Sequence, residues 1–268
     1  MDSISYSAFR TTIRLNFLNF EERPELFKPS DSRGEGKADL DIYLYRGKRK
    51  EISRKAERSR FPVSAETFEG KKVIRLYDGK SKRVFCFFEE GLLIDLVTNR
   101  ALNLPLMDLQ NVLDIVFMHS ASIVMNGKAY LFIAPSGGGK STIAALARDE
   151  GFFVIDDDFC AVKRSGGSFF AARFPCFLSK RKRFKEWEVG GLFLLNKSKE
   201  NKVRPVSGIE ALRDALPEAV RYPRERVGAM RNQDYLRDVF CFLDEMIDRV
   251  GLSVLDFKKE AGVFSCLV

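Results

Sequence analysis

Three consecutive glycines followed by Lys-Ser-Thr constrain the fold of this chain more than any other stretch of its sequence. They lie in Ala134–Thr142 (APSGGGKST), after the apolar run Lys128–Ile133 and before Ser141–Arg148, a predicted helix that Gly151 is placed to end. Residues without side chains let successive backbone N–H groups face a single anion, and the positive N-terminal end of a helix adds to their field. The segment therefore predicts a strand, a phosphate-binding loop and a helix in succession.

The polar residues of this loop fit a nucleoside triphosphate. Lys140 can reach the β- and γ-phosphates, and the Ser141 hydroxyl can bind Mg²⁺. Ala134 replaces the first glycine of the usual pattern, which removes only one flexible position. We therefore expect ATP or another nucleoside triphosphate, together with Mg²⁺, as cofactors. The residues predicted to bind the nucleotide are Ser136, Gly137, Gly138, Gly139, Lys140, Ser141 and Thr142.

Three consecutive acids, Asp156, Asp157 and Asp158, follow the next predicted strand, Phe152–Ile155. In an α/β sheet the carboxyl ends of the strands face the ligand. Phosphoryl transfer to a hydroxyl needs a carboxylate for the metal and a base for the hydroxyl proton. The acids therefore predict a reaction site beside the loop. The alternative is a solvated acidic turn or a helix cap.

The chain has a single histidine, His119, which excludes any site that needs two imidazoles, such as a two-histidine zinc hydrolase. His119 precedes a predicted hairpin, in which Asn126-Gly127 joins Ala121–Met125 to Lys128–Ile133. Because this hairpin leads into the loop, we expect the imidazole near Asp157, where it can orient the carboxylate or tune its proton affinity. A structural histidine is the alternative.

These features together resemble a known family. The segment His119–Val162 is similar to the catalytic core of HPr kinase/phosphorylase, and more distantly to ATP-dependent phosphoenolpyruvate carboxykinase. Both the loop Ser136–Ser141, of the form SGxGKS, and the strand Val154–Asp158 with its terminal acids fit the family pattern. The resemblance implies an α/β fold (α+β overall), in which a β-rich N-terminal region accompanies a P-loop kinase core. Relatives form oligomers, so it also implies a homo-oligomer.

The resemblance further implies roles for individual residues. Asp157 would accept the proton, Asp158 would assist Mg²⁺, and His119 would set the protonation of Asp157, although the order of the two acids can be reversed. The chain departs from the family at Gly190, where we would place an arginine that supports phosphorolysis, so the reverse reaction is not expected. The assigned catalytic residues are Asp157, His119 and Lys140, and the assigned metal ligands are Ser141 and Asp158. Arg173 and Lys180 are candidates for binding the acceptor, and the alternative for these two residues is an ordinary surface role.

The sequence changes character near Pro105, which predicts a β-rich region at 1–104 and a P-loop core at 105–268. Alternating or apolar runs predict strands in the first region, and apolar spacing at Leu109, Val112, Leu113, Val116 and Phe117 predicts a helix after Asp108. Ser3–Phe17 alternates in part, and the remaining predicted strands are Asp39–Tyr45, Lys72–Leu76, Arg83–Phe88, Gly91–Leu96, Leu192–Leu195 and Ser253–Phe257. A hairpin is predicted at Lys163–Phe170, and the remaining predicted helices are Ile209–Leu216 and Tyr235–Val250.

Charge and composition limit the partners. The 45 Lys and Arg exceed the 37 Asp and Glu by a formal net charge of +8, which favours anionic partners such as a nucleotide, a phosphorylated ligand or an acidic peptide. Both signs are interspersed and the densest basic run, Lys180–Lys185, is short, which argues against nucleic acid. No signal peptide or membrane-spanning run is recognisable, and the five cysteines form no metal pattern. We therefore expect a cytoplasmic protein with buried free thiols and no membrane partner.

Three functions remain open from the sequence. The first is a Mg-ATP-dependent kinase that phosphorylates a serine-type hydroxyl on a peptide, a protein or a small molecule. The second is a nucleotide-binding regulatory or switch protein with vestigial or slow ATP hydrolysis. The third, a carboxykinase, is disfavoured because its transition-metal site needs histidine and lysine ligands and His119 is the only histidine.

Overall fold

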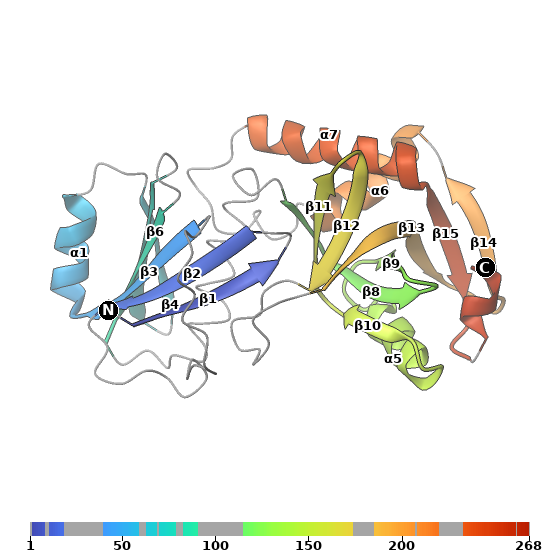
Figure 1. The fold of residues 1–268 in the computed structure, drawn as a ribbon, viewed down its shortest axis with the longest axis horizontal. Helices are drawn as coiled ribbons and strands as arrows, with labels where there is room; N and C mark the ends of the chain where they lie inside the picture. Colours follow the sequence, from blue (N-terminus) through green and yellow to red (C-terminus); the bar gives the residue numbers. More distant parts are fainter. Residues whose placement is uncertain are drawn as a thin grey trace. The chain divides into compact units, whose positions relative to one another are not determined.

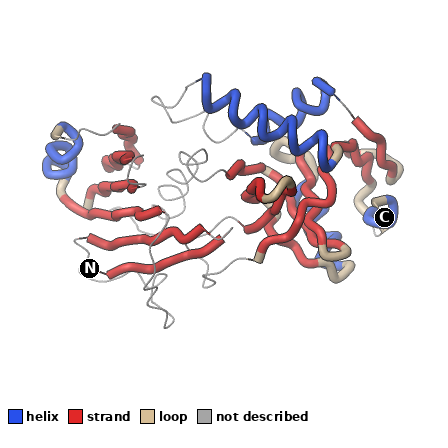
Figure 2. The backbone as a smooth tube through the Cα atoms, turned by 45° about the horizontal axis from the view of Figure 1, so that its top comes forward, coloured by secondary structure: helices blue, strands red, loops and turns tan. Residues whose placement is uncertain are grey.

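The computed structural model describes residues 2–8, 11–18, 40–58, 63–68, 70–78, 83–90, 115–173, 185–206, 208–219, 233–260 and 262–267. Within these ranges the chain has a mixed α/β fold in which strands outweigh helices (Figure 2). The chain divides into two compact units, one with the described elements before residue 91 and the other with those from residue 115 onward (Figure 1).

The first unit is a six-stranded sheet with one helix. Helix α1 (Arg49–Glu57) places Ile52 in a small core with Ile74, Leu76 and Phe87 of the sheet. The predicted strands at Asp39–Tyr45, Lys72–Leu76 and Arg83–Phe88 are confirmed, whereas α1 is missed because Ile52 is the one apolar anchor in a highly charged stretch. The strand order is β1 (Asp2–Ala8), β2 (Thr11–Leu18), β3 (Leu40–Gly47), β6 (Arg83–Glu89), β5 (Lys71–Asp78) and β4 (Val63–Phe68).

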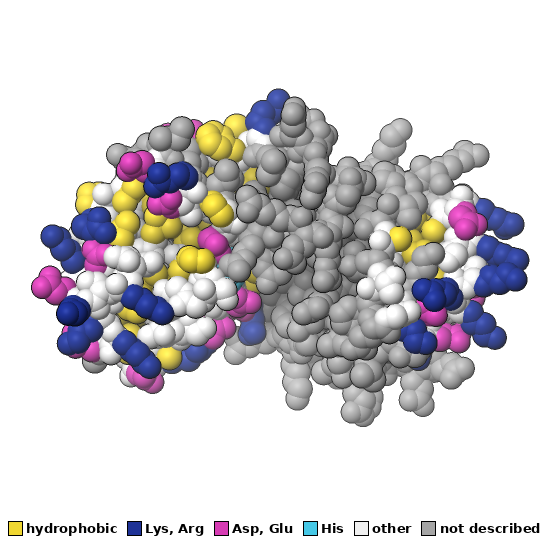
Figure 3. Space-filling view, turned by 180° about the vertical axis from the view of Figure 1, so that it is seen from behind, with side chains coloured by type: hydrophobic (Ala, Val, Ile, Leu, Met, Phe, Trp, Pro, Cys, Tyr) yellow, Lys and Arg dark blue, Asp and Glu magenta, His cyan; other side chains and the backbone are white. Residues whose placement is uncertain are grey.

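Part of the positive charge of the chain gathers around α1. Figure 3 shows Lys and Arg side chains grouped on the first unit. The ammonium of Lys55 lies 3.9 Å from the centre of the Tyr45 ring, a cation–π contact. A surface hollow of about 380 Å³ is lined by Lys48, Lys50, Glu51, Arg54, Lys55 and Arg58.

The second unit is built on a larger sheet. Its central strands β9 (Lys128–Ile133), β13 (Glu186–Lys197) and β15 (Leu252–Phe257) are parallel to one another. The remaining pairings given by the structure are antiparallel. The other strands are β10 (Phe153–Asp156), β8 (Ser120–Met125), β12 (Ser168–Arg173), β11 (Cys160–Ser165), β7 (Ile115–Met118) and β14 (Lys202–Val206), in the order β10-β8-β9-β13-β12-β11-β7, with β15 beside β13 and β14 beside β15.

Helices cover both faces of this sheet. Strand β9 alternates, with Leu131 in the core shared with α7 (Gln233–Val250) and α6 (Gly208–Ala219), and Phe132 in the core shared with α5 (Lys140–Asp149). The second core also contains Phe264 of the short 3₁₀ helix η4 (Val263–Cys266). Because alternate side chains of β9 point to opposite faces of the sheet, this strand contributes to both cores. The link from β9 to α5 leaves the sheet at the carboxyl ends of its parallel strands.

Turns predicted from glycine are confirmed. Asn126 and Gly127 have φ values of 50° and 77°, as a tight hairpin turn between β8 and β9 requires. Gly166 and Gly167 turn the β11–β12 hairpin with φ values of 59° and 81°. Gly151 follows α5 with φ 81°.

One helix prediction is wrong where it can be compared. Val116 and Phe117 lie in strand β7, which pairs with β11. All four residues of β7 are buried, so the strand needs apolar side chains on both of its faces. Such a continuous apolar run also matches the spacing of a helix, which is why the prediction failed. The rest of that prediction, from Asp108 to Leu113, and the strand predicted at Gly91–Leu96 lie outside the described residues.

The cysteines differ in environment. Cys86 and Cys160 are buried, and burial raises the pKa of the Cys160 thiol to about 12. Cys241 is exposed on α7, so the prediction that it is buried is wrong, and Cys266 is half-buried. None of these four cysteines forms a disulfide, and Cys176 lies outside the described residues. Among the helices that the structure describes, none has the length and apolar character needed to span a membrane.

Candidate functional site

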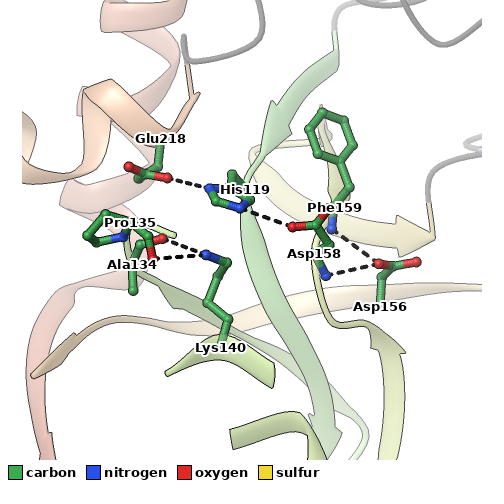
Figure 4. A network of polar contacts seen from close by, with 8 residues as sticks. All are labelled: His119, Ala134, Pro135, Lys140, Asp156, Asp158, Phe159 and Glu218. Carbon is green, nitrogen blue, oxygen red and sulfur yellow. Dashed lines mark hydrogen bonds and ion pairs between the residues drawn. The ribbon is translucent and has the colours of Figure 1, made fainter. Parts of the chain in front are cut away.

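Strand pairing brings the predicted site residues to one edge of the second sheet. Strands β9 and β10 both run antiparallel to β8, with Ser120 opposite Ile133 and Ser122 opposite Asp156. The carboxyl ends of β9 and β10 therefore lie at the edge where β8 begins, directly after His119. The glycine loop, the acids and the histidine meet there (Figure 4).

The loop is too tightly folded for side chains at its centre. The N–H of Gly138 donates to the carbonyl of Pro135 at 2.9 Å. A Cβ atom at Gly138 would lie 2.6 Å from the Cβ of Ala134, closer than packed carbon atoms approach. Gly137 and Gly139 have φ values of 79° and 113°, which L side chains rarely adopt. The close approach at Gly138 and the positive φ values at Gly137 and Gly139 thus explain why this loop contains three glycines.

Lys140, the first residue of α5, directs its ammonium group into the loop. Its Nζ donates to the carbonyls of Ala134 at 2.8 Å and Pro135 at 3.2 Å, and the residue is only 6% exposed (Figure 4). A buried ammonium needs such acceptors. The loop therefore combines a fixed cation with the positive end of a ten-residue helix.

Replacing Gly139 by alanine is expected to disturb both the loop and the protein's stability. The new Cβ would lie 2.5 Å from Cζ of Phe257, a ring that is itself buried, and it would occupy a strained φ. Overpacking of this kind costs about 1–3 kcal/mol. We expect a lower melting temperature and weaker ATP binding, measured by calorimetry. In the control Gly151→Ala, φ is 81° but no atom lies within 4 Å of the new Cβ, so ATP affinity should be kept. Equal ATP affinity in both variants would contradict the steric explanation.

Asp156 shapes the acidic turn after β10. Its Oδ1 accepts the N–H groups of Asp158 and Phe159, both at 3.1 Å, and its Oδ2 lies 3.3 Å from Nε of Arg173. Burial raises the pKa of this carboxyl, and the two N–H groups and Arg173 oppose the rise. Asp156 thus has a structural role, because its carboxylate holds the acidic turn in place. Asp157 and Asp158 project from that turn.

The histidine contacts Asp158 rather than Asp157. Nε2 of the buried His119 lies 3.0 Å from Oδ1 of Asp158, whereas Asp157 pairs with Arg148 of α5 at 3.2 Å. The expected placement of His119 against Asp157 is therefore wrong, because the side chains of consecutive turn residues diverge. Of the two acids, Asp158 is therefore the one in contact with the imidazole.

A residue that the sequence did not indicate lies on the other side of the imidazole. Oε2 of Glu218, on α6, is 2.5 Å from Nδ1 of His119, and the Glu218 side chain is 10% exposed (Figure 4). The two residues are 99 positions apart, and no motif surrounds Glu218. Only the docking of α6 near the start of β8 reveals the contact.

The remaining predicted residues have different positions. Arg173 ends β12 at the site, where it pairs with Asp156, and Lys180 lies outside the described residues. Gly190 lies in β13 beside the start of β9, at the opposite edge of the sheet from the loop. Within the described ranges, no three His, Cys, Asp or Glu side chains are arranged to hold a metal ion. Of the loop residues, Ser136, Gly137 and Ser141 are exposed, and Gly138, Gly139 and Thr142 are half-buried.

Comparison with known proteins gives little beyond this geometry. No protein-family model matches the chain, and no curated protein is similar to it in sequence. A solved structure of the HPr(Ser) kinase/phosphatase from Coxiella burnetii aligns with 34% of this chain and 77% of its own chain, at 14% identity and a TM-score of 0.24. A similarity of this size is too weak to support a fold or a function.

Proposed function

We propose that the chain is a Mg-ATP-dependent kinase that transfers the γ-phosphoryl group to a serine-type hydroxyl on a peptide, a protein or a small molecule. The observation that supports this proposal most directly is the convergence, at one sheet edge, of a glycine loop containing Lys140 and a carboxylate, Asp158, in contact with His119. A loop alone would account for nucleotide binding. The adjacent carboxylate adds the base that a hydroxyl acceptor requires.

The residues present fit the donor nucleotide. The backbone N–H groups of the loop and the N-terminus of α5 supply donors for phosphate oxygens, and the Lys140 ammonium supplies a fixed charge. Mg²⁺ in phosphoryl-transfer sites binds one or two carboxylates together with the phosphates. The exposed Ser141 and the half-exposed Asp157 are the candidate ligands on this chain. Mg-ATP, when bound, supplies the phosphoryl group and neutralises part of its charge.

Asp158 is assigned here as the base, which exchanges the roles first expected for the two acids. Its side chain is 65% exposed, so an acceptor can approach it, while the buried His119 holds one of its oxygens. As the acceptor oxygen bonds to the γ-phosphorus, its proton passes to Asp158 and the bond to the β–γ bridging oxygen breaks, leaving ADP. Arg173, 47% exposed at the same edge, remains a candidate for holding the acceptor.

The decisive experiment incubates the purified chain with γ-labelled ATP and fractionated cell extract, and identifies any labelled product by mass spectrometry. We expect a phosphorylated hydroxyl that is absent when Asp158→Asn replaces the wild type. The regulator or switch alternative predicts saturable ATP binding with no labelled product in any fraction. That outcome would exclude a kinase acting on the acceptors present.

A further inference from the structure

We propose that Glu218 is a positioning residue that fixes the imidazole of His119 so that Nε2 faces Asp158. The contact itself stands on geometry alone. Its consequence for turnover rests on the proposed kinase function. Glu218 is not expected to touch the acceptor oxygen, because it lies on the opposite side of the imidazole from Asp158 (Figure 4).

Glu218 holds His119 at two points. Its Oε2 lies 2.5 Å from Nδ1 of the ring, and its backbone carbonyl accepts the backbone N–H of His119 at 3.2 Å. The backbone bond fixes where the histidine lies, and the side-chain bond fixes how its ring is turned. With both in place, Nε2 lies 3.0 Å from Oδ1 of Asp158.

The position of Glu218 is unfavourable by local rules, which suggests a role beyond helix formation. It lies in the last turn of α6 (Gly208–Ala219), where the partial negative charge of the helix end disfavours a carboxylate. It is also buried, and a buried carboxylate is costly without a partner. The imidazole of His119 is that partner. Places where a sequence breaks local rules are expected to be functional sites.

The chemistry of the contact sets the tautomer of the ring. An ionised carboxylate only accepts hydrogen bonds, so we expect Nδ1 to carry the proton that is donated to Glu218. Nε2 is then the acceptor nitrogen, so it can accept a hydrogen bond from Asp158 once that carboxyl has taken the proton of the acceptor hydroxyl. The three side chains lie in a row, with a buried acid at one end, 10% exposed, and an exposed acid at the other, 65% exposed. A buried acid that holds a histidine in one tautomer is a recurrent device for aiming its second nitrogen.

The single histidine of the chain makes this inference directly measurable. In a two-dimensional NMR spectrum of the histidine ring nitrogens, all signals come from His119, so no residue assignment is needed. We expect the wild-type spectrum to show a protonated Nδ1. A spectrum in which Nδ1 is unprotonated and Nε2 carries the only proton would overturn the proposal, and it requires no mutation.

The matched variants are Glu218→Gln and the control Glu210→Gln, which makes the same chemical change at an exposed position of α6. Glu218→Gln should alter the ring nitrogen signals and lower the turnover of ATP, with water as the acceptor, by about 10- to 100-fold, as loss of an orienting partner typically does. The dissociation constant for ATP should stay within about twofold of the wild-type value, because no residue of the loop is changed. Glu210→Gln should change none of these quantities.

A purely structural role for Glu218 predicts a different pattern. The melting temperature would fall while the ring signals and the turnover of the folded variant stayed at wild-type values, and this result would overturn the proposal. If the wild type turns over no ATP and labels no acceptor, the proposed kinase function fails. The ring signals of the wild type and of Glu218→Gln then still decide whether Glu218 positions His119.

Discussion

Lys140→Ala is expected to weaken ATP binding by about 10- to 100-fold, because hydrogen bonds to a charged group contribute about 1.5–3 kcal/mol. The loss of turnover should be larger than the loss of affinity. The ammonium lies within the loop, where the proposed reaction would build up negative charge on the transferring phosphoryl group. Removal of one such stabilising group costs about 10²- to 10³-fold in rate.

Isothermal titration calorimetry and the rate of ATP hydrolysis measure the two effects separately. The matched control is Lys128→Ala, which removes an exposed lysine at the far end of β9, where it lies 3.8 Å from Glu188. Because Lys140→Ala leaves two loop carbonyls without their donor, its melting temperature should be recorded as well. A folded Lys140→Ala protein that binds ATP like the control would show that this loop is not the nucleotide site.

Asp158→Asn is expected to lower phosphoryl transfer by about 10²- to 10⁴-fold, the usual contribution of a general base, while ATP binding persists. Asparagine keeps the size of the side chain but cannot accept the acceptor's proton. Asp157→Asn should act mainly on the metal, so its defect should lessen as the Mg²⁺ concentration rises. Transfer rates for the two variants, measured over a range of Mg²⁺ concentrations, distinguish the roles.

The opposite pattern has an equally clear meaning. If Asp157→Asn abolishes transfer at every Mg²⁺ concentration while Asp158→Asn responds to Mg²⁺, the order of the acids first expected from the sequence is correct. Asp158 would then assist the metal, and its contact with His119 would orient a ligand instead of a base. Full activity in both variants would remove both acids from the mechanism.

Elements specified by their own residues could be predicted from the sequence. The β8–β9 hairpin follows from Asn126-Gly127, whose positive φ values few other residues tolerate. The link from β9 to α5 follows from glycines whose neighbours leave no space for a Cβ. Strand β7 and helix α1 could not be predicted, because burial on both faces hides the period of β7 and α1 has only Ile52 as a buried anchor.

The glycine loop, with Lys140 at its end, was determined by the sequence alone, because a few adjacent residues dictate both its shape and its chemistry. Tertiary structure decided what surrounds it. The turn held by Asp156 directs Asp158 to His119, and packing of α6 brings Glu218 to the same ring from 99 positions away. Backbone preferences act over a few residues, whereas the partner of a buried imidazole depends on which distant elements pack together.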